Sequence, residues 1–251
     1  MKKHRSIIVT GASRGIGAAV ARQAAQTGWA VCVNYRTQPD EAHALVDWIK
    51  AQGGQALAIK ADLSVEDDIV AMFKRVDEAL PPLGCLVNNA ARVAPTRLRL
   101  SDMSANEING LFCVNVTGAM VAAREATARM STASGGQGGS IVNVSSMAAK
   151  HGAPNLYVHY AASKAALDTF TYGFALEVAS EGVRVNAVRP GLIDTEIHMR
   201  AGMPKRVEKV GPRLPMGRAG TADEVAKAIL WLASDDASYI TGALVDVGGG
   251  A

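Results

Sequence analysis

Tyr160 and Lys164 are the two side chains of this sequence whose types and spacing most directly suggest proton transfer. Four residues apart on a helix, they share one face and lie one turn from each other. A free tyrosine has a pKa of about 10, and a lysine ammonium nearby favours the phenolate and lowers that pKa. A tyrosine shifted in this way acts as a general acid or a general base. The pair is a weak signal by itself, because Tyr-x-x-x-Lys also occurs on ordinary amphipathic helices.

A second candidate is the glycine-rich stretch Gly11-Ala12-Ser13-Arg14-Gly15-Ile16-Gly17, which follows an apolar strand-like segment. Glycines let the backbone turn sharply and approach a pyrophosphate closely, and a helix N-terminus offers free N–H groups to phosphates. The spacing Gly-x-x-x-Gly-x-Gly departs from the Gly-x-Gly-x-x-Gly dinucleotide fingerprint. The stretch therefore predicts a nucleotide-binding loop with moderate specificity, and a plain strand-to-helix turn is the structural alternative.

The same stretch also matches Gly-x-Ser-x-Gly, the nucleophile elbow of α/β-hydrolases. Its place on the first strand leaves nothing upstream to supply a second oxyanion donor. The third glycine, Gly17, has no role in an elbow, and only Asp194 and His198 could be made to complete a triad. A hydrolase is therefore the minor alternative.

Strand-like and helix-like segments alternate along the whole chain, which predicts parallel strands, right-handed crossovers and helices on both faces of one sheet. We expect a single doubly wound α/β (Rossmann) domain, residues 1–251, with a seven-stranded parallel sheet and ligands at the carboxyl ends of its strands. The expected strands are 6–10, 30–34, 56–60, 85–88, 140–144, 184–188 and 243–247, and the expected helices are 16–27, 41–52, 65–80, 119–130, 160–179 and 222–232.

Residues 195–220 form the least regular stretch, with three prolines and four glycines. In a compact domain such a stretch is either a functional lid or poorly ordered. Because it follows a strand end, we expect it to hang over the binding cleft as a substrate lid.

Composition narrows the class of protein. Apolar residues make up 49% of the chain and charged residues 20%, and the net charge of +3 is spread along the sequence, so neither a nucleic acid nor a membrane is an expected partner. No targeting segment stands out, which predicts a cytoplasmic protein. The three cysteines have no Cys-x-x-Cys spacing and are expected to be buried free thiols, and the histidines show no metal-ligand spacing.

With the glycine loop at the front and the Tyr/Lys pair behind it, the chain resembles the short-chain dehydrogenase/reductase family over nearly its whole length. Residues 10–17 resemble the family's Thr-Gly-x-x-x-Gly-x-Gly cofactor loop. Further matching segments follow in the family's order: Ala61-Asp62-Leu63, Asn88-Asn89-Ala90-Ala91, Asn115, Ile141-Val142-Asn143-Val144-Ser145-Ser146, Tyr160 with Lys164, Pro190-Gly191 with Thr195, Thr241-Gly242, and Asp246-x-Gly248-Gly249.

The resemblance implies an oxidoreductase that transfers a hydride between a nicotinamide and a carbonyl or secondary alcohol. It implies that Ser146 and Tyr160 hold the substrate oxygen and that Tyr160 donates the proton. Lys164 would tune Tyr160 and hold the nicotinamide ribose, and Asn115 would hold a water that relays protons. The protein supplies position and electrostatics for the cofactor's chemistry.

Two departures from the family pattern bear on these roles. Ala91 replaces the usual glycine of the Asn-Asn-Ala-Gly stretch, and the 14 residues from Ser146 to Tyr160 exceed the spacing of many members by one. The second departure leaves Ser145 as an alternative to Ser146, which we favour for its position relative to the strand.

NADP(H) is the cofactor that the second strand favours. Tyr35 stands where NAD-preferring relatives show an aspartate, and Arg36 and Arg14 suit the 2′-phosphate of NADP. Two ordinary solvent-facing arginines are the alternative interpretation. The residues expected at the cofactor are Gly11, Ser13, Arg14, Gly15, Ile16, Gly17, Tyr35, Arg36, Asp62, Leu63, Asn89, Ala90, Ala91, Tyr160, Lys164, Pro190, Gly191, Ile193 and Thr195.

Several functions remain open within this resemblance. A reductase or dehydrogenase of small carbonyl or alcohol substrates leads, and a glucose-like substrate is one option. A 3-oxoacyl-[acyl-carrier-protein] reductase is less favoured, because residues 131–139 hold no Lys or Arg for an acidic carrier and Glu181 stands where a basic residue could serve. A non-catalytic nucleotide sensor would have lost one of the four catalytic residues. The resemblance also implies a homotetramer built on the helix at 160–179 and the C-terminal helix and strand.

Overall fold

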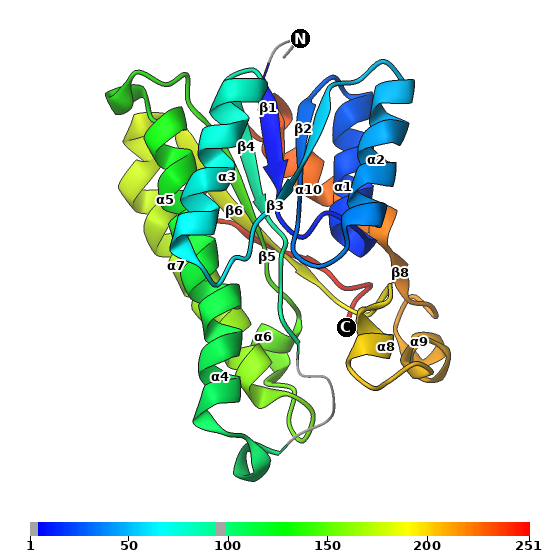
Figure 1. Ribbon diagram of the computed structural model, residues 1–251. Coiled ribbons are helices and arrows are strands. Elements are labelled where there is room, and N and C mark those ends of the chain that lie inside the picture. Colours follow the sequence, from blue (N-terminus) through cyan, green and yellow to red (C-terminus); the bar gives the residue numbers. More distant parts are fainter. Residues whose placement is uncertain (1–4, 94–98) are drawn as a thin grey trace.

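A seven-stranded parallel sheet runs through the centre of the computed structural model, which describes residues 5–93 and 99–251 apart from the side chain of Arg200 (Figure 1). The strand order is β3-β2-β1-β4-β5-β6-β9, and every neighbouring pair is parallel. The strands are β1 (Ser6–Val9), β2 (Ala30–Tyr35), β3 (Ala56–Lys60), β4 (Leu83–Asn88), β5 (Gly139–Val144), β6 (Val183–Pro190) and β9 (Leu244–Val247).

The order of the strands reverses between β1 and β4. From β1 the chain builds outward through β2 and β3, and it then crosses back to place β4 on the other side of β1. The crossover connections from these two strands leave in opposite directions, which opens a crevice at their carboxyl ends. The fold therefore predicts a ligand site next to the ends of β1 and β4.

Helices cover both faces of the sheet, as the alternating pattern predicts. On one face lie α1 (Gly15–Gln26), α2 (Pro39–Ala51) and α10 (Ala222–Ala233); on the other lie α3 (Glu66–Ala79), α5 (Gly118–Met130) and α7 (Val158–Val178) (Figure 1). Because side chains alternate along a strand, Ile7 and Val9 of β1 enter the first hydrophobic core while Ile8 enters the second. Burial on both faces explains why the strands are almost continuously apolar.

All seven predicted strands and six predicted helices are confirmed, with ends that shift by at most two residues. Several short elements lie in stretches without clear periodicity. These are α4 (Ala105–Phe112), the π-helical η2 (Cys113–Thr117), α6 (Ala148–His151), β7 (Ile193–Asp194), α8 (Ile197–Arg200), α9 (Arg206–Val210), β8 (Gly220–Thr221), and the 3₁₀ turns η1 (Leu100–Asp102), η3 (Thr132–Ser134), η4 (Ala179–Glu181), η5 (Gly211–Arg213) and η6 (Asp235–Ala237).

The segment at 195–220 is more ordered than the sequence suggests. It carries α8, α9 and η5, and it is bracketed by the parallel pair β7 and β8, in which Ile193 faces Gly220 and Asp194 faces Thr221. Beyond β8, the Thr221 hydroxyl accepts a hydrogen bond from the Glu224 amide and caps α10. Both ends of the segment are thus fixed at one place beside the carboxyl edge of the sheet (Figure 1).

Within residues 5–93 and 99–251, no helix is both long enough and apolar enough to cross a membrane. The same residues contain no group of three His, Cys, Asp or Glu side chains that could hold a metal ion. Cys32 and Cys85 are buried free thiols as predicted, whereas Cys113 is only half-buried, which corrects the expectation for that residue. It lies where α4 passes into η2, at the edge of the second helix layer.

Candidate active site

A cavity of about 570 Å³ opens at the carboxyl ends of the central strands and holds nearly all of the predicted site residues. It extends from the glycine loop, past the ends of β2, β4 and β5, to the start of α7 and the segment at 195–220. Among the predicted residues, Gly17 and Asn115 do not line it. Those that do are Gly11, Ser13, Arg14, Gly15, Ile16, Tyr35, Arg36, Asp62, Leu63, Asn89, Ala90, Ala91, Ser146, Tyr160, Lys164, Pro190, Gly191, Ile193 and Thr195.

The glycine loop turns as its sequence requires. Gly11 and Gly15 have positive φ angles of 61° and 54°, a conformation that side-chain-bearing residues rarely adopt. Gly17 acts from behind the loop: a Cβ there would lie 2.5 Å from Nδ2 of Asn89 and 2.6 Å from the Gly11 carbonyl oxygen. Helix α1 begins at Gly15 with no acidic residue in its first turn, so its N–H groups and positive dipole end are free for phosphates.

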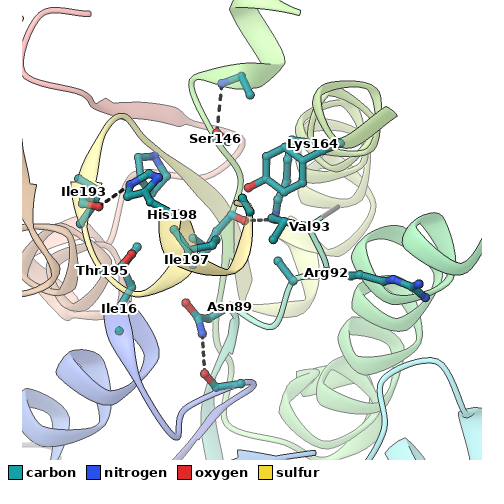
Figure 2. Close-up of a pocket in the computed structure, with 18 of the residues that line it drawn as sticks. Ile16, Asn89, Arg92, Val93, Ser146, Lys164, Ile193, Thr195, Ile197 and His198 are labelled. Atoms are coloured by element: carbon teal, nitrogen blue, oxygen red, sulfur yellow. Dashed lines mark hydrogen bonds between the residues drawn. The ribbon is translucent and has the colours of Figure 1, made fainter. Parts of the chain in front are cut away.

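Buried polar side chains hold this loop in place. The Thr10 hydroxyl accepts hydrogen bonds from the backbone N–H groups of Asn89 (2.9 Å) and Ala90 (3.0 Å). In return, the Asn89 amide donates to the carbonyl oxygens of Thr10 (2.8 Å) and Gly11 (3.1 Å) (Figure 2). Asn34, at the end of β2, accepts a bond from the Gly11 N–H at 3.1 Å. Asn34 was not among the predicted site residues. A buried amide on an otherwise apolar strand indicates a polar contact at the strand end, and this pattern could have identified it.

Arg36 and Asp62 meet at the end of the cavity beside β2 and β3. Nη1 of Arg36 lies 3.6 Å from Oδ2 of Asp62, and both side chains are partly exposed. Partial burial raises the pKa of Asp62, but hydrogen bonds from Ser64 and the charge of Arg36 outweigh that effect and leave the pKa below its usual value. Tyr35 packs edge-on against His43 at 5.9 Å. This end of the cavity therefore presents a guanidinium beside an ionised carboxylate.

Ser146, Tyr160 and Lys164 come together at the opposite end. Tyr160 is 8% exposed, and both it and Ser146 line the cavity. Nζ of Lys164 lies 5.7 Å from the centre of the Tyr160 ring and donates to the Val144 carbonyl oxygen at 2.7 Å. The predicted helical spacing thus places both side chains on the cavity side of α7, opposite the end of β5.

The two serines after β5 have different partners. The Ser145 hydroxyl is buried and donates to the backbone oxygen of Lys164 at 3.2 Å. The half-buried Ser146 accepts from the Ala148 N–H at 3.1 Å (Figure 2), and its hydroxyl lowers the pKa of the Tyr160 phenol in part. Both line the cavity, but Ser146 is the one whose hydroxyl adjoins the phenol.

The acidities of Tyr160 and Lys164 follow from their burial. Burial raises the pKa of Tyr160 well above its usual value; the hydrogen bond from Ser146 lowers it only in part, and Tyr157 raises it further. Burial also lowers the pKa of Lys164 to about 8, against an opposing effect of Asp168. The expectation that Lys164 lowers the pKa of Tyr160 is therefore wrong for the protein alone, because the loss of solvation outweighs a lysine whose ammonium points at Val144.

Asn115 lies behind the cavity wall, in the π-helical turn η2. Its Oδ1 accepts from the Arg92 N–H at 2.7 Å, and its Nδ2 donates to the Arg92 carbonyl oxygen at 3.0 Å and to the Ser163 hydroxyl at 3.1 Å. The side chain thereby ties the loop after β4 to α7. Its suggested role in holding a water stays a prediction.

Several cavity residues carried no clear sequence signal. Tyr157 packs edge-on against Tyr160 with ring centres 5.5 Å apart, and the ring of His198 bonds to the Ile193 carbonyl oxygen at 2.8 Å (Figure 2). Arg206 reaches the cavity from α9. Met147, Ile193 and Ile197 form apolar parts of the cavity wall, whereas Met199 is 63% exposed and does not line it.

The connection between Ser146 and Tyr160 contains an unusual turn. Ala153 and Asn155 have positive φ angles of 45° and 58°, and they follow Gly152, which has a φ of 72°. Left-handed backbone at an alanine is strained and calls for support from its surroundings. The chain passes through this turn between Ser146 and Tyr160, and both of these residues line the cavity.

Comparison with known proteins places the chain in a family. A family model described as enoyl-(acyl carrier protein) reductase matches residues 11–251. The uncharacterized oxidoreductase YgfF of Escherichia coli is 49% identical over 97% of this chain and 98% of its own length. The 3-oxoacyl-[acyl-carrier-protein] reductase FabG of Staphylococcus aureus is 36% identical over 100% and 99%. The chain belongs to the short-chain dehydrogenase/reductase family.

Solved structures of the family agree with this fold. A short-chain dehydrogenase from Burkholderia cenocepacia in complex with NADP superposes with a TM-score of 0.89 and 33% identity over 99% of this chain and 98% of its own. A short-chain dehydrogenase/reductase variant from Serratia marcescens gives 0.90 and 31% over the same shares. As a short-chain dehydrogenase/reductase, the protein is an NAD(P)-dependent oxidoreductase, so the hydrolase and sensor alternatives are not supported.

The low pKa of Lys164 predicts an unusual dependence of stability on pH. Between about pH 8 and the pKa of about 10.4 of a free lysine, the unfolded chain holds this proton and the folded chain does not, so stability rises with pH. Relative to Lys164→Met, the wild-type free energy of unfolding should increase by about 2–3 kcal/mol from about pH 7 to about pH 10. Urea unfolding at both pH values measures this, and parallel profiles for the two proteins would contradict it.

Proposed function

We propose that the protein is an NADP(H)-preferring reductase that interconverts a carbonyl and a secondary alcohol on a small molecule, with Tyr160 as the proton-transfer residue. The observation that carries the proposal is that Ser146, Tyr160 and Lys164 line one end of the cavity together, with the Lys164 ammonium 5.7 Å from the centre of the Tyr160 ring. Two hydroxyls side by side can hold one substrate oxygen. Lys164, whose ammonium would stabilise negative charge on the phenol, lies next to them.

The residues at the other end of the cavity fit a dinucleotide. Gly11 and Gly17 let the loop pack closely against Ala90 and Asn89, where a Cβ would clash, and the start of α1 turns its N–H groups and positive dipole end toward a pyrophosphate. In the proposed role, Pro190, Gly191 and Thr195 hold the nicotinamide end near Tyr160. The bound cofactor supplies the hydride.

In reduction, Ser146 and Tyr160 both donate hydrogen bonds to the carbonyl oxygen and polarise it. The raised pKa of Tyr160 keeps the phenol protonated until negative charge develops on that oxygen, which then takes the proton. Lys164 stabilises the phenolate that remains. Asn115 holds the backbone of Arg92 against α7, and in our proposal it also positions the path by which solvent returns the proton.

Tyr160→Phe should lower kcat/KM for reduction by about 10²–10⁴-fold, because it removes the proton donor while keeping the ring. Ser146→Ala should reduce activity strongly, whereas Ser145→Ala, whose hydroxyl bonds to the Lys164 backbone, should act mainly on stability. NADPH oxidation is followed with ketones, aldehydes, sugars, diketones and a 3-oxoacyl thioester. An active Tyr160→Phe variant, with NADPH binding unchanged by fluorescence titration, would overturn the role of Tyr160.

The preference for NADP over NAD is part of the proposal. Arg36 and Arg14 line the end of the cavity where β2 stops, and Tyr35 occupies the place of an acidic residue that would repel a phosphate. The complex of the Burkholderia relative with NADP supports this preference.

Arg36→Gln should raise the Kd for NADPH by about 10–100-fold and leave that for NADH nearly unchanged, because only the phosphorylated cofactor gains a charge-assisted bond from the guanidinium. The matched control is Lys60→Gln, which removes an exposed charge at the end of β3, outside the cavity lining. If Arg36→Gln weakened the binding of NADPH and NADH equally, Arg36 would serve to pair with Asp62 and to hold the loop, and it would not recognise the 2′-phosphate.

Reduction of a 3-oxoacyl thioester is the second candidate, favoured by the relatives named FabG. Against it stands the segment 131–139, which offers no Lys or Arg to an acidic carrier protein. We also propose that residues 195–220 act as the substrate lid, since nine of them line the cavity. The free thiols are compatible with a reducing compartment, and the cytoplasm is the location that we propose.

We further propose a homotetramer. Large side chains are exposed on the outer face of α7, at Tyr172 and Leu176. Two more are exposed in the C-terminal part of the chain, at Trp231 of α10 and at Tyr239 before β9. Such surfaces are typical of contacts between subunits. Sedimentation velocity should give four times the mass of the chain, and Leu176→Glu should dissociate the assembly; a monomeric wild type would contradict the proposal.

A further inference from the structure

Arg206 is a cation that reaches the substrate end of the cavity from α9. Its guanidinium carbon lies 6.0 Å from the centre of the Tyr157 ring, and that ring packs edge-on against Tyr160 at 5.5 Å. A single aromatic ring therefore separates the guanidinium from the proposed proton donor.

No carboxylate pairs with Arg206 among the residues that the structure describes. Nη1 contacts the sulfur of Met203 at 3.2 Å, and Nε is buried without a hydrogen-bond partner. The titratable neighbour is His198; its pKa is lowered by burial and, to a smaller extent, by the charge of Arg206. By contrast, Arg218 in the same segment pairs with Glu224 at 2.6 Å. The fold thus leaves donors of Arg206 unsatisfied beside the cavity.

Three other charged side chains that line the cavity, those of Lys164, Arg92 and Glu196, are directed to other parts of the protein. Lys164 donates to the Val144 carbonyl oxygen. Arg92 extends toward α4 and away from Ser146 and Lys164, and its Nη1 would lie 2.7 Å from a Cβ at Gly110 (Figure 2). Glu196 reaches back to the glycine loop, where its Oε2 would lie 3.9 Å from a Cβ at Gly15. Arg206 is therefore the charge that a substrate meets beyond Tyr157.

We propose that Arg206 recognises a carboxylate on the substrate, so that the substrates are oxo acids and the corresponding hydroxy acids, with the carboxylate a few bonds from the reacting carbonyl. The inference rests on the proposed function of Tyr160. A planar guanidinium binds a carboxylate through two parallel hydrogen bonds, and an aromatic face holds it flat while excluding water. Here Tyr157 supplies that face, and the unpartnered Nε is one of the donors that such a pair would use.

The test compares an acid with its neutral ester. Levulinate and 5-oxohexanoate place the carboxylate at two distances from a ketone, and their methyl esters keep the ketone but remove the charge. The wild type should reduce at least one acid with a kcat/KM about tenfold or more above that of its ester. Arg206→Gln should remove this preference, mainly through KM, and leave the ester nearly unaffected. Arg206→Lys should restore part of it, and Arg213→Gln, an exposed charge on the same segment, should not alter it.

Binding gives a readout that does not depend on turnover. Calorimetric titration of the NADP⁺-loaded protein with each acid should show binding by the wild type and by Arg213→Gln, weakened by about tenfold or more in Arg206→Gln. Reduction of the uncharged 2,3-butanedione tests the Tyr160 chemistry separately. If butanedione is reduced but neither binding nor turnover of the acids depends on Arg206, the inference is overturned and the proposed function stands. If no ketone is reduced but Arg206-dependent binding remains, the proposed chemistry fails and the carboxylate site stands.

Discussion

The ammonium group of Lys164 is almost completely buried, and it donates a hydrogen bond to the last carbonyl oxygen of β5, that of Val144. A buried charge is tolerated only with good partners, so this contact fixes where α7 can lie against the sheet. The Ser145 hydroxyl adds a second bond in the opposite direction, to the Lys164 backbone. With strand and helix joined twice, Tyr160 faces Ser146. Asp168, one turn further along α7, pairs with Arg189 of β6 at 2.9 Å and keeps negative charge near the ammonium.

Other buried polar side chains extend this arrangement along the carboxyl edge of the sheet. Asn88 on β4 donates to Asn143 on β5 at 3.0 Å, and Asn143 donates to the Thr171 hydroxyl on α7 at 2.8 Å. Unpaired, these amides would be strongly unfavourable in such a core; paired, they set the register of strand against helix. On the nucleotide side, Thr10 and Asn89 do the same for the glycine loop. The cavity is thus framed by hydrogen bonds that exist before any ligand binds.

The seven strands, their parallel arrangement and the large helices could be predicted from the sequence, because each depends on local periodicity and on the handedness of parallel crossovers. Local motifs also predicted the glycine loop and the spacing of Tyr160 and Lys164. The short helices around the cavity could not be predicted, because their residues follow no clear period and are positioned by tertiary contacts. The rise in the pKa of Tyr160 in the protein alone could not be predicted, since burial cannot be read from a four-residue spacing, and the effect of Lys164 together with a bound nicotinamide stays a prediction. No sequence pattern pointed to Arg206, because its role depends on the absence of a carboxylate partner among the described residues, and only the folded structure shows this.

The π-helical turn at Cys113–Thr117 joins α4 and α5 into one rod that contains more residues than an α-helix of that length. The widened turn directs Asn115 inward, where both ends of its amide meet the backbone of Arg92. Residues before and after the turn are out of phase with respect to a regular helix. Loss of one residue within these five would restore a regular α-helical turn and leave α4 and α5 in line, but it would remove the widening that directs Asn115 inward. The extra residue of this turn therefore serves to place one side chain, Asn115, and the two helices on either side do not need it for their own packing.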